Sequence, residues 1–454
     1  MPQTVNLTGT LVYKPEKCWN GFVLIPSSAQ STALGARLID MNGNVVKAWP
    51  GVLGAFDNKL LPGGDIIGSS AEIPGVPLEM LDLIQVDWDN NRVWKAPDMD
   101  EQTAGGVTYR TARPHHDFQR EGNPVGYYAP GQLPLRKGKT LINSNRNVNH
   151  PHISPVTLSD SRLVIVDEAG NECWSWQLMD HFDELGLSEA AKNAFFRFPG
   201  VKPGMGYAKE TYLNNCAWLG PNKWYDAGDE RFHPDNVITD IRSLNISFII
   251  DHVSGDIVWR LGPDYESTPA LRKLGAIIGQ HEVHMIPKGL PGAGNILIFD
   301  NGGHAGYGIP TPNAPTGQYN QGRCFSRVIE IDPISLEIVW SYGDYRGQLE
   351  SELSLFFSAI CSGMQRLPNG NTQIAEATCG RIFEVTPEGE IVWEYVDPAG
   401  FVFRAHRYPY DWAPAPRPEE IPVVPPSNVR LRLGGIAPAD ADEAFFTRKS
   451  LWRS

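Results

Sequence analysis

The sequence lacks several features that would place the protein outside the ordinary globular class. Its six cysteines, spread over 454 residues, form no Cys-x-x-Cys pair, which excludes zinc ribbons and thioredoxin-type motifs. No window is apolar over the length of a membrane span. The N-terminus has no basic segment followed by an apolar one. We therefore expect a cytoplasmic protein with free thiols and no association with a membrane.

Positive charge is also scarce. The sequence contains 39 Lys and Arg against 52 Asp and Glu, for a net charge of −13. This balance argues against nucleic acids and anionic membrane surfaces as partners. It leaves an anionic small molecule open, because a local group of Arg and His can oppose the overall field. Glycine and proline, in contrast, are abundant at 45 and 37 residues, which favours many short strands and turns over helical bundles.

One phrase recurs six times: an apolar strand ending in Asp or Thr, a polar turn, and a second strand ending in Trp, with Lys47 in that place in the first copy. Its copies are residues 38–47, 84–94, 164–174, 249–259, 329–340 and 383–393. Each predicts a β-hairpin. A second phrase predicts an earlier hairpin in residues 60–67, 285–297 and 367–374. The pattern predicts an all-β fold, a six-bladed β-propeller.

We expect the propeller to span residues 1–412. Long insertions at about 98–140, 178–232 and 302–326 are predicted to cover one mouth of the central channel. Within the second insertion, residues 188–196 predict a helix. Residues 413–454 begin with a Pro-rich run and include a strand-like segment, 428–433. They are expected to form an extension on the outside, and its use as the interface of a homodimer is left open.

Histidines gather in one stretch. Residues 279–304 hold His281 and His284 before a turn and an apolar strand, and His304 after them. In an all-β scaffold, functional side chains usually sit on loops at the ends of strands, held by the rigid sheet. The stretch is therefore predicted to belong to a functional site.

Several phrases in and around this stretch resemble the bacterial arylsulfotransferase (aryl-sulfate sulfotransferase, ASST) family. They are residues 280–284 (QHEVH), 289–302, 255–262, 364–372 and 402–408. The likeness covers roughly residues 35–412. It implies a six-bladed propeller that moves a sulfuryl group from one phenol to another through a covalent sulfohistidine. At the matching position stands His281, and neutral imidazole is nucleophilic near pH 7.

The resemblance also implies helper residues. His116 or His115 matches an early histidine of the family, Arg242 matches its arginine, and Asn215 matches its asparagine. Leu213 replaces a second family histidine. General acid help is typically worth about 10²–10⁴ in rate, so this replacement is expected to slow phenol transfer.

Further candidates for contact with a small aromatic substrate are His115, His284, His304, His152, His406 and Tyr207. The resemblance implies no cofactor. A divalent metal held by His116, His152 and His281 is left open as the alternative. The alternative function is a lyase or hydrolase on the same propeller scaffold, His-based or metal-assisted, with His281 as a base or a metal ligand. It would act on an aromatic or carboxylated small molecule.

Overall fold

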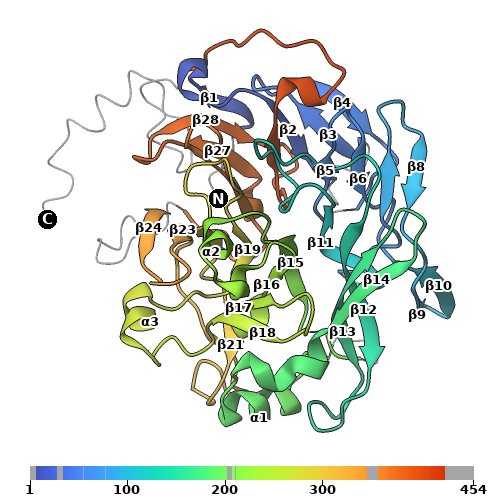
Figure 1. The fold of residues 1–454 in the computed structure, drawn as a ribbon, viewed down its shortest axis with the longest axis vertical. Coiled ribbons are helices and arrows are strands. Elements are labelled where there is room, and N and C mark those ends of the chain that lie inside the picture. Colours follow the sequence, from blue (N-terminus) through green and yellow to red (C-terminus); the bar gives the residue numbers. More distant parts are fainter. Residues whose placement is uncertain are drawn as a thin grey trace, which may run out of the picture.

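The computed structural model describes residues 7–27, 34–54, 56–76, 78–201, 207–209, 211–344 and 356–424. Six of the sheets that their strands form stand around a central axis as the blades of a β-propeller, and two further two-stranded sheets lie in the connections (Figure 1). The predicted all-β, six-bladed fold is confirmed. No helix in these ranges is long and apolar enough to cross a membrane.

Each blade is built from four antiparallel strands, and most of the first strands contact the first strand of a neighbouring blade around the centre. From the centre outwards, blade 1 consists of β29 (His406–Tyr408), β2 (Phe22–Ile25), β3 (Ala36–Ile39) and β4 (Val45–Trp49), and blade 2 of β5 (Lys59–Leu60), β6 (Ile66–Gly68), β7 (Ile84–Val86) and β8 (Arg92–Lys95). Blade 3 consists of β11 (Pro114–Arg120), β12 (Thr140–Val148), β13 (Leu158–Val166) and β14 (Glu172–Gln177), and blade 4 of β15 (Leu213–Trp218), β16 (Val237–Ile241), β17 (Ile246–Ile250) and β18 (Ile257–Leu261). Blade 5 consists of β19 (His281–Met285), β20 (Ile296–Asp300), β23 (Arg327–Ile331) and β24 (Ile338–Tyr342), and blade 6 of β25 (Gly363–Arg366), β26 (Thr372–Glu376), β27 (Arg381–Val385) and β28 (Ile391–Val396).

Strands from both ends of the chain close the ring. The last strand, β29, pairs with β2 and becomes the innermost strand of blade 1. The first strand, β1 (Gly9–Tyr13), pairs with β28 as a fifth strand at the outer edge of blade 6. In Figure 1 the blue and red segments accordingly lie together. Closing the ring in this way leaves only short sheet edges.

The repeated phrase forms the outer hairpin of every blade. Its Asp follows the third strand and accepts a hydrogen bond from a backbone N–H of the turn, as Asp40 Oδ1 does from Asn44 at 2.8 Å. In blade 6, Thr386 Oγ1 takes this role and accepts the N–H of Glu390 at 3.2 Å. Such local bonds explain why Asp or Thr recurs at this position.

Tryptophans link neighbouring blades. The indole N–H of Trp393 in blade 6 donates to the carbonyl of Met41 in the outer turn of blade 1, at 2.8 Å. Equivalent bonds join Trp49 to Asp87, Trp176 to Gly255, Trp259 to Pro333 and Trp340 to Pro387. In blades 1 and 3 the linking residue lies two positions beyond the end of the repeated phrase. Two positions along a strand return to the same face, so the contact is kept.

The connecting segments carry additional elements. Residues 98–140 contain the hairpin β9 (Asp100–Ala104) and β10 (Val107–Thr111) as well as β11, and residues 302–326 contain β21 (Ala305–Tyr307) and β22 (Gln318–Gln321). Residues 178–232 contain η2 (Leu178–Leu185), α1 (Glu189–Arg197), β15, α2 (Lys223–Asp226) and η3 (Glu230–Phe232). Further short helices are η1 (Pro15–Lys17), η4 (Arg242–Leu244), α3 (Pro269–Leu274), η6 (Ala377–Cys379) and η7 (Tyr410–Trp412). Helix α1 is the predicted one, and Ser188 Oγ caps it by accepting the N–H of Ala191 at 3.2 Å.

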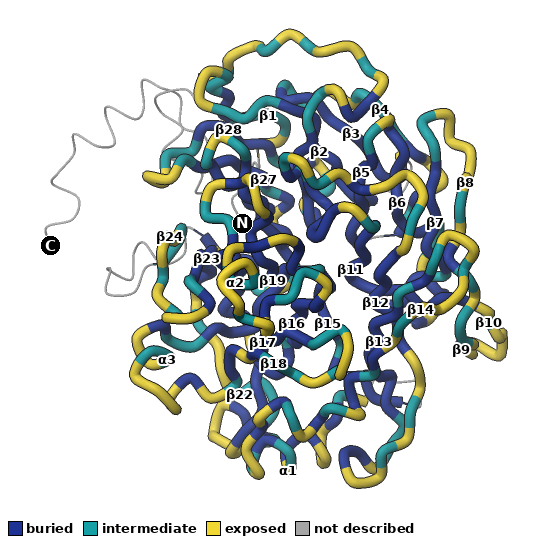
Figure 2. Tube along the Cα trace, viewed as in Figure 1, coloured by how far each residue is buried: buried dark blue, intermediate teal, exposed yellow. Residues whose placement is uncertain are grey.

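Buried residues fill the blades and exposed ones lie mainly on the outer turns (Figure 2). At the C-terminal side, Val423 exchanges two backbone hydrogen bonds with Tyr13, at 2.8 and 2.9 Å. This pairing holds the start of the Pro-rich extension against β1. The predicted strand-like segment 428–433 lies outside the described residues.

Candidate functional site

The topology brings two kinds of loop to one mouth of the central channel. The inner strands of all blades begin at the same end, and the second strand of each blade, being antiparallel, ends there too. Loops before the inner strands supply Phe56, Tyr212, Cys361, Phe403 and Arg404. The inner strands themselves supply His115, His116 and His281, and the segments after β16 and β20 supply Arg242 and Asn301. Residues from all parts of the chain therefore meet at this mouth.

Breaks in strand register help to form the site. The pairing of β11 with β12 shifts between Pro114 and Phe118, and that of β19 with β20 shifts between His281 and His284. Within these breaks His116 has a φ of 58° and Glu282 a φ of 52°. A non-glycine residue in this left-handed region is strained, and such strain clusters at functional sites.

His115 fixes the tautomer of His116. His115 Nε2 lies 3.1 Å from the carbonyl oxygen of Ser144, which can only accept, so Nε2 carries the proton. Burial lowers the pKa of His115 to about 3, so its Nδ1 is a bare lone pair at neutral pH. That lone pair lies 2.8 Å from His116 Nδ1, which must donate. The remaining nitrogen, His116 Nε2, therefore carries a lone pair.

Aromatic rings surround His116. Its imidazole stacks between Phe56 and Tyr212, with ring centroids 4.6 and 5.0 Å away and interplanar angles of 23° and 17°. Phe403 meets it edge-on at 5.9 Å. Burial, together with the nearby His115 and His281, lowers the pKa of His116 well below its usual value. The site thus holds a neutral imidazole that is fixed between aromatic side chains.

His281 is held in a matching tautomer. The amide of Asn301 donates to the carbonyls of Ser358 and Cys361, so its Oδ1 accepts the Nδ1–H of His281 at 2.8 Å. Nε2 then carries a lone pair, which accepts a hydrogen bond from the backbone N–H of Cys361 at 3.1 Å. Burial, followed by the charge of Arg242, lowers the pKa of His281 to about 3. His281 is therefore neutral and potentially nucleophilic at physiological pH.

Arg242 is the cation beside His281. Its Nη2 donates to the carbonyls of His304 at 3.1 Å and Ala359 at 3.5 Å. Its Nε–H is buried and has no hydrogen-bond partner among the described residues. A guanidinium with a spare donor can hold an anionic oxygen.

A network of six buried charged groups lies beside the mouth: Asp57, Lys59, Asp117, Glu282, Arg404 and His406. Burial alone would raise the pKa of Glu282, but His406, 2.6 Å away, and Arg404 hold it at about 2. Glu282 and Asp57 in turn raise the pKa of His406 against the effect of burial. With His406 protonated, three formal positive charges face three negative ones. Asp57, Glu282 and His406 also place possible ligand atoms within 4.8 Å of one another, and Nε2 of His406 is engaged in its ion pair with Glu282.

His284 and Asn215, two further residues predicted from the sequence, are buried and hydrogen-bonded. His284 donates from Nδ1 to the carbonyl of Glu282 and accepts the hydroxyl of Tyr127 at Nε2, both at 2.8 Å. Asn215 donates to the carbonyl of Val283 at 2.6 Å and so joins β15 to β19. Both residues link elements around the channel.

Three further candidates differ in their relation to the mouth. The His304 side chain is exposed, and only its carbonyl contacts Arg242. His152 is exposed in the turn after β12. The Tyr207 hydroxyl is buried and accepts the Gln102 amide at 3.2 Å.

The suggested metal set of His116, His152 and His281 does not assemble. These three are among the described residues, yet the groups whose ligand atoms lie within 4.8 Å of one another contain none of them. His116 and His281 are buried in the channel mouth, whereas His152 lies on an exposed turn.

Sequence reasoning missed Phe56, Asn301 and Cys361. Asn301 directly follows the apolar strand of the His-rich stretch, and this position could have identified it. Phe56 and Cys361 precede inner strands, but loops before strands contain many such residues. Leu213, which stands where the family has a histidine, is buried in an apolar cluster with Leu141 and Leu163.

Comparison with known proteins gives a family match. The family model Arylsulfotransferase (ASST) matches residues 131–396. No curated protein matches the sequence.

Solved structures resemble the chain only distantly. A protein of unknown function from Bacteroides caccae has 13% identity and a TM-score of 0.41, covering 86% of this chain and 99% of that one. A putative 6-phosphogluconolactonase from Bacteroides fragilis has 12% identity and a TM-score of 0.36, covering 85% and 97%. A virginiamycin B lyase from Staphylococcus aureus has 10% identity and a TM-score of 0.35, covering 88% and 87%. Such distant likeness transfers no activity.

Proposed function

The chain belongs to the arylsulfotransferase family, and on that premise we propose that it transfers a sulfuryl group between phenolic compounds through a sulfated His281. The observation that carries the proposal is the pair of neutral imidazoles at one mouth, with the nearby cation Arg242. Each imidazole has its Nδ1–H engaged, so each directs the chemistry to Nε2. The proposed reaction needs no cofactor.

In the first half-reaction, the lone pair of His281 Nε2 attacks the sulfur of an aryl sulfate. The N–S bond forms as the bond from sulfur to the aryl oxygen breaks, and the phenolate leaves. Asn301 Oδ1, which accepts the Nδ1–H at 2.8 Å, stabilises the positive charge that develops on the imidazole. The spare Nε–H of Arg242 is suited to the departing phenolate or a sulfuryl oxygen.

The amide of Cys361 must exchange partners during this step. It donates to His281 Nε2 before reaction, and once sulfur is bound that lone pair is used. The N–H is then free to donate to a sulfuryl oxygen. Backbone donors aimed at developing charge are a common means of stabilising such states.

In the second half-reaction, the oxygen of an acceptor phenol attacks the sulfur and the N–S bond breaks. His116 Nε2 takes the phenolic proton as the new O–S bond forms. Because the pKa of His116 is low, the imidazolium then passes the proton to solvent, where it balances the charge of the phenolate released in the first half-reaction. Phe56 and Tyr212, which stack on His116, hold its imidazole in place and give the site apolar, aromatic walls.

A single-turnover incubation with 4-nitrophenyl sulfate, followed by intact-mass analysis, tests this function. We expect one nitrophenolate released and a mass gain of one sulfuryl group per chain, both lost in His281→Ala. His304→Ala is the control, since its exposed side chain is not used. Absence of the adduct and of released nitrophenolate in the unchanged protein would contradict the proposal.

A further inference from the structure

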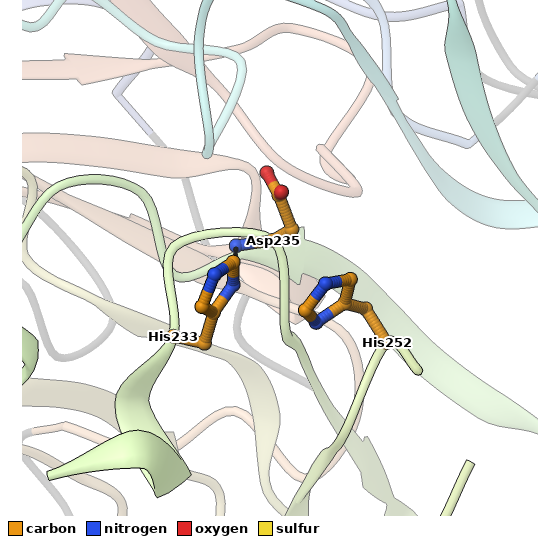
Figure 3. Close-up of side chains that lie close together, drawn as sticks. All are labelled: His233, Asp235 and His252. Atoms are coloured by element: carbon orange, nitrogen blue, oxygen red, sulfur yellow. Dashed lines mark hydrogen bonds between the residues drawn. The ribbon is translucent and has the colours of Figure 1, made fainter. Parts of the chain in front are cut away.

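A second group of potential ligands lies in blade 4, where His233, Asp235 and His252 gather (Figure 3). One ligand atom from each lies within 4.8 Å of the other two. His233 and Asp235 lie between η3 and β16, and His252 lies in the turn between β17 and β18. Two imidazoles and a carboxylate form a donor set that suits a divalent transition metal.

The position of this group separates it from the channel mouth described above. The connections between the first and second strands, and between the third and fourth, both lie at the end of a blade opposite to where its inner strand begins. His233 and His252 belong to these two connections. An ion here would therefore take no part in chemistry at His281.

Hydrogen bonds to Asn236 fix the orientation of the His252 ring. The amide of Asn236 donates to the carbonyls of Arg231 at 3.1 Å and Glu230 at 3.5 Å, which leaves its Oδ1 as an acceptor. That oxygen accepts both the backbone N–H and the Nδ1–H of His252, at 3.0 and 2.9 Å. Nε2 of His252 therefore carries the lone pair. A carbonyl or amide partner on the other ring nitrogen is what metal-binding histidines typically have.

The orientation of the His233 ring relative to His252 decides which of the two must move to bind an ion. Its ring stacks on that of His252, with centroids 4.3 Å apart and planes at 18° (Figure 3). A bound ion lies in the plane of each imidazole that holds it, so one of two nearly parallel rings must turn. The hydrogen bond that holds the His233 ring comes from the N–H of Asp235 to Nδ1, at 3.2 Å. This bond is longer than the 2.9 Å bond that holds the His252 ring, so the His233 ring is the one that turns.

We propose that His233, Asp235 and His252 bind one divalent transition metal ion, with His252 Nε2 as the fixed ligand. Three protein ligands leave at least one coordination position open, as in Zn²⁺ sites that accept water or a further ligand. Asp235 and His252 also line a cleft of about 600 Å³ between blades 3 and 4, walled by Trp174 and Trp218. The open position faces a space that can admit a small anionic or nitrogen-containing ligand. The ion also ties together two connections of blade 4.

Calorimetric titration of the full-length, EDTA-treated protein with Zn²⁺ tests the site. We expect one Zn²⁺ per chain, with affinity at least about tenfold weaker in His252→Ala and in His233→Ala. Asp235→Asn keeps the shape of the side chain and removes its charge, and is expected to weaken binding as well. Co²⁺ in place of Zn²⁺ gives a visible absorption band that reports nitrogen and oxygen ligands.

The matched control is His152→Ala. His152, which is exposed, and His150, which is partly buried, form another pair with ring centroids 5.8 Å apart. They belong to no group of three ligands among the described residues. Binding should be unchanged in this variant. No Zn²⁺ binding, unchanged binding in His252→Ala, or loss of binding in His152→Ala would each overturn the proposal. Circular dichroism of every variant confirms that the fold is kept.

Discussion

His115 Nδ1 and His116 Nδ1 lie 2.8 Å apart, and the carbonyl of Ser144 on the far side of His115 decides which of them donates. His115 is thus a positioning residue for the proposed base. We expect His115→Ala to slow the second half-reaction by about 10–100-fold, by analogy with the partners that orient metal-binding histidines. KM for the acceptor should change little.

His115→Asn provides the conservative variant. An amide can accept from His116 through its oxygen and donate to Ser144 through its nitrogen, so activity should be largely restored. Acceptor-dependent turnover from pH 6 to 9 measures both variants. If His115→Asn is as slow as His115→Ala, the tautomer argument is wrong, because bulk alone would then explain the loss.

The presence of Leu213 predicts that the rate of the first half-reaction depends on the pKa of the leaving phenol. Because this apolar side chain stands where the family has a histidine, the departing phenolate receives charge stabilisation from Arg242 but no proton from that position. We expect the first half-reaction to slow steeply as the pKa of the leaving phenol rises. Stopped-flow release from a series of substituted phenyl sulfates measures this slope. A flat series would show that a proton donor acts on the leaving oxygen.

Arg242→Gln tests the cation. Removing one group that stabilises developing charge typically costs about 10²–10³ in rate, so we expect a loss of that size in kcat. Arg146→Gln is the control, because the Arg146 side chain is 45% exposed and pairs only loosely with Asp100, at 3.7 Å. Comparable losses in both variants would refute a specific role for Arg242.

Asp160 predicts a pH dependence of stability. Burial raises its pKa from 3.8 to about 8, so the folded state holds a proton that the unfolded state releases. The resulting stabilisation is complete below pH 3.8 and is lost as the pH rises towards 8. Asp160→Asn mimics the protonated form. We expect it to match the unchanged protein at pH 4 and to gain on the order of 1 kcal/mol per pH unit above that.

Urea unfolding at pH 4, 6 and 8 checks this prediction. The difference in the free energy of unfolding between the two proteins should grow with pH. A constant difference would mean that Asp160 is ionised in the folded state throughout.

Replacing Lys59 tests how much the buried charge network contributes to the free energy of unfolding. It contacts the carboxylates of Asp57 and Asp117 and is almost fully buried. Lys59→Met leaves both carboxylates without this partner, and we expect a loss of about 3–5 kcal/mol in the free energy of unfolding. Lys192→Met, at a surface pair with Asp183, should cost less than about 1 kcal/mol. Equal losses would show that the network contributes no more than a surface pair.

The sequence alone determined the blades. Each outer hairpin carries its own turn residue, such as Asp40 or Thr386, and its own strand pattern, so local hydrogen bonds and period-two burial suffice to predict it. Even so, Trp49 and Trp176 lie just past the phrase and make the same kind of hydrogen bond to the next blade as Trp259, Trp340 and Trp393 do. Local patterns fix which elements form, and their ends only to within a residue or two.

The site was decided by the tertiary structure. His281 and Arg242 can be identified from the sequence. Asn301 and Cys361 can be assigned to the site only from the structure, in which the ring places the ends of second strands beside the starts of inner ones. The choice between His115 and His116 depends on a single carbonyl, that of Ser144, which lies on a different strand. Hydrogen-bond direction is set by neighbours that are distant in the chain, and no local pattern encodes those neighbours.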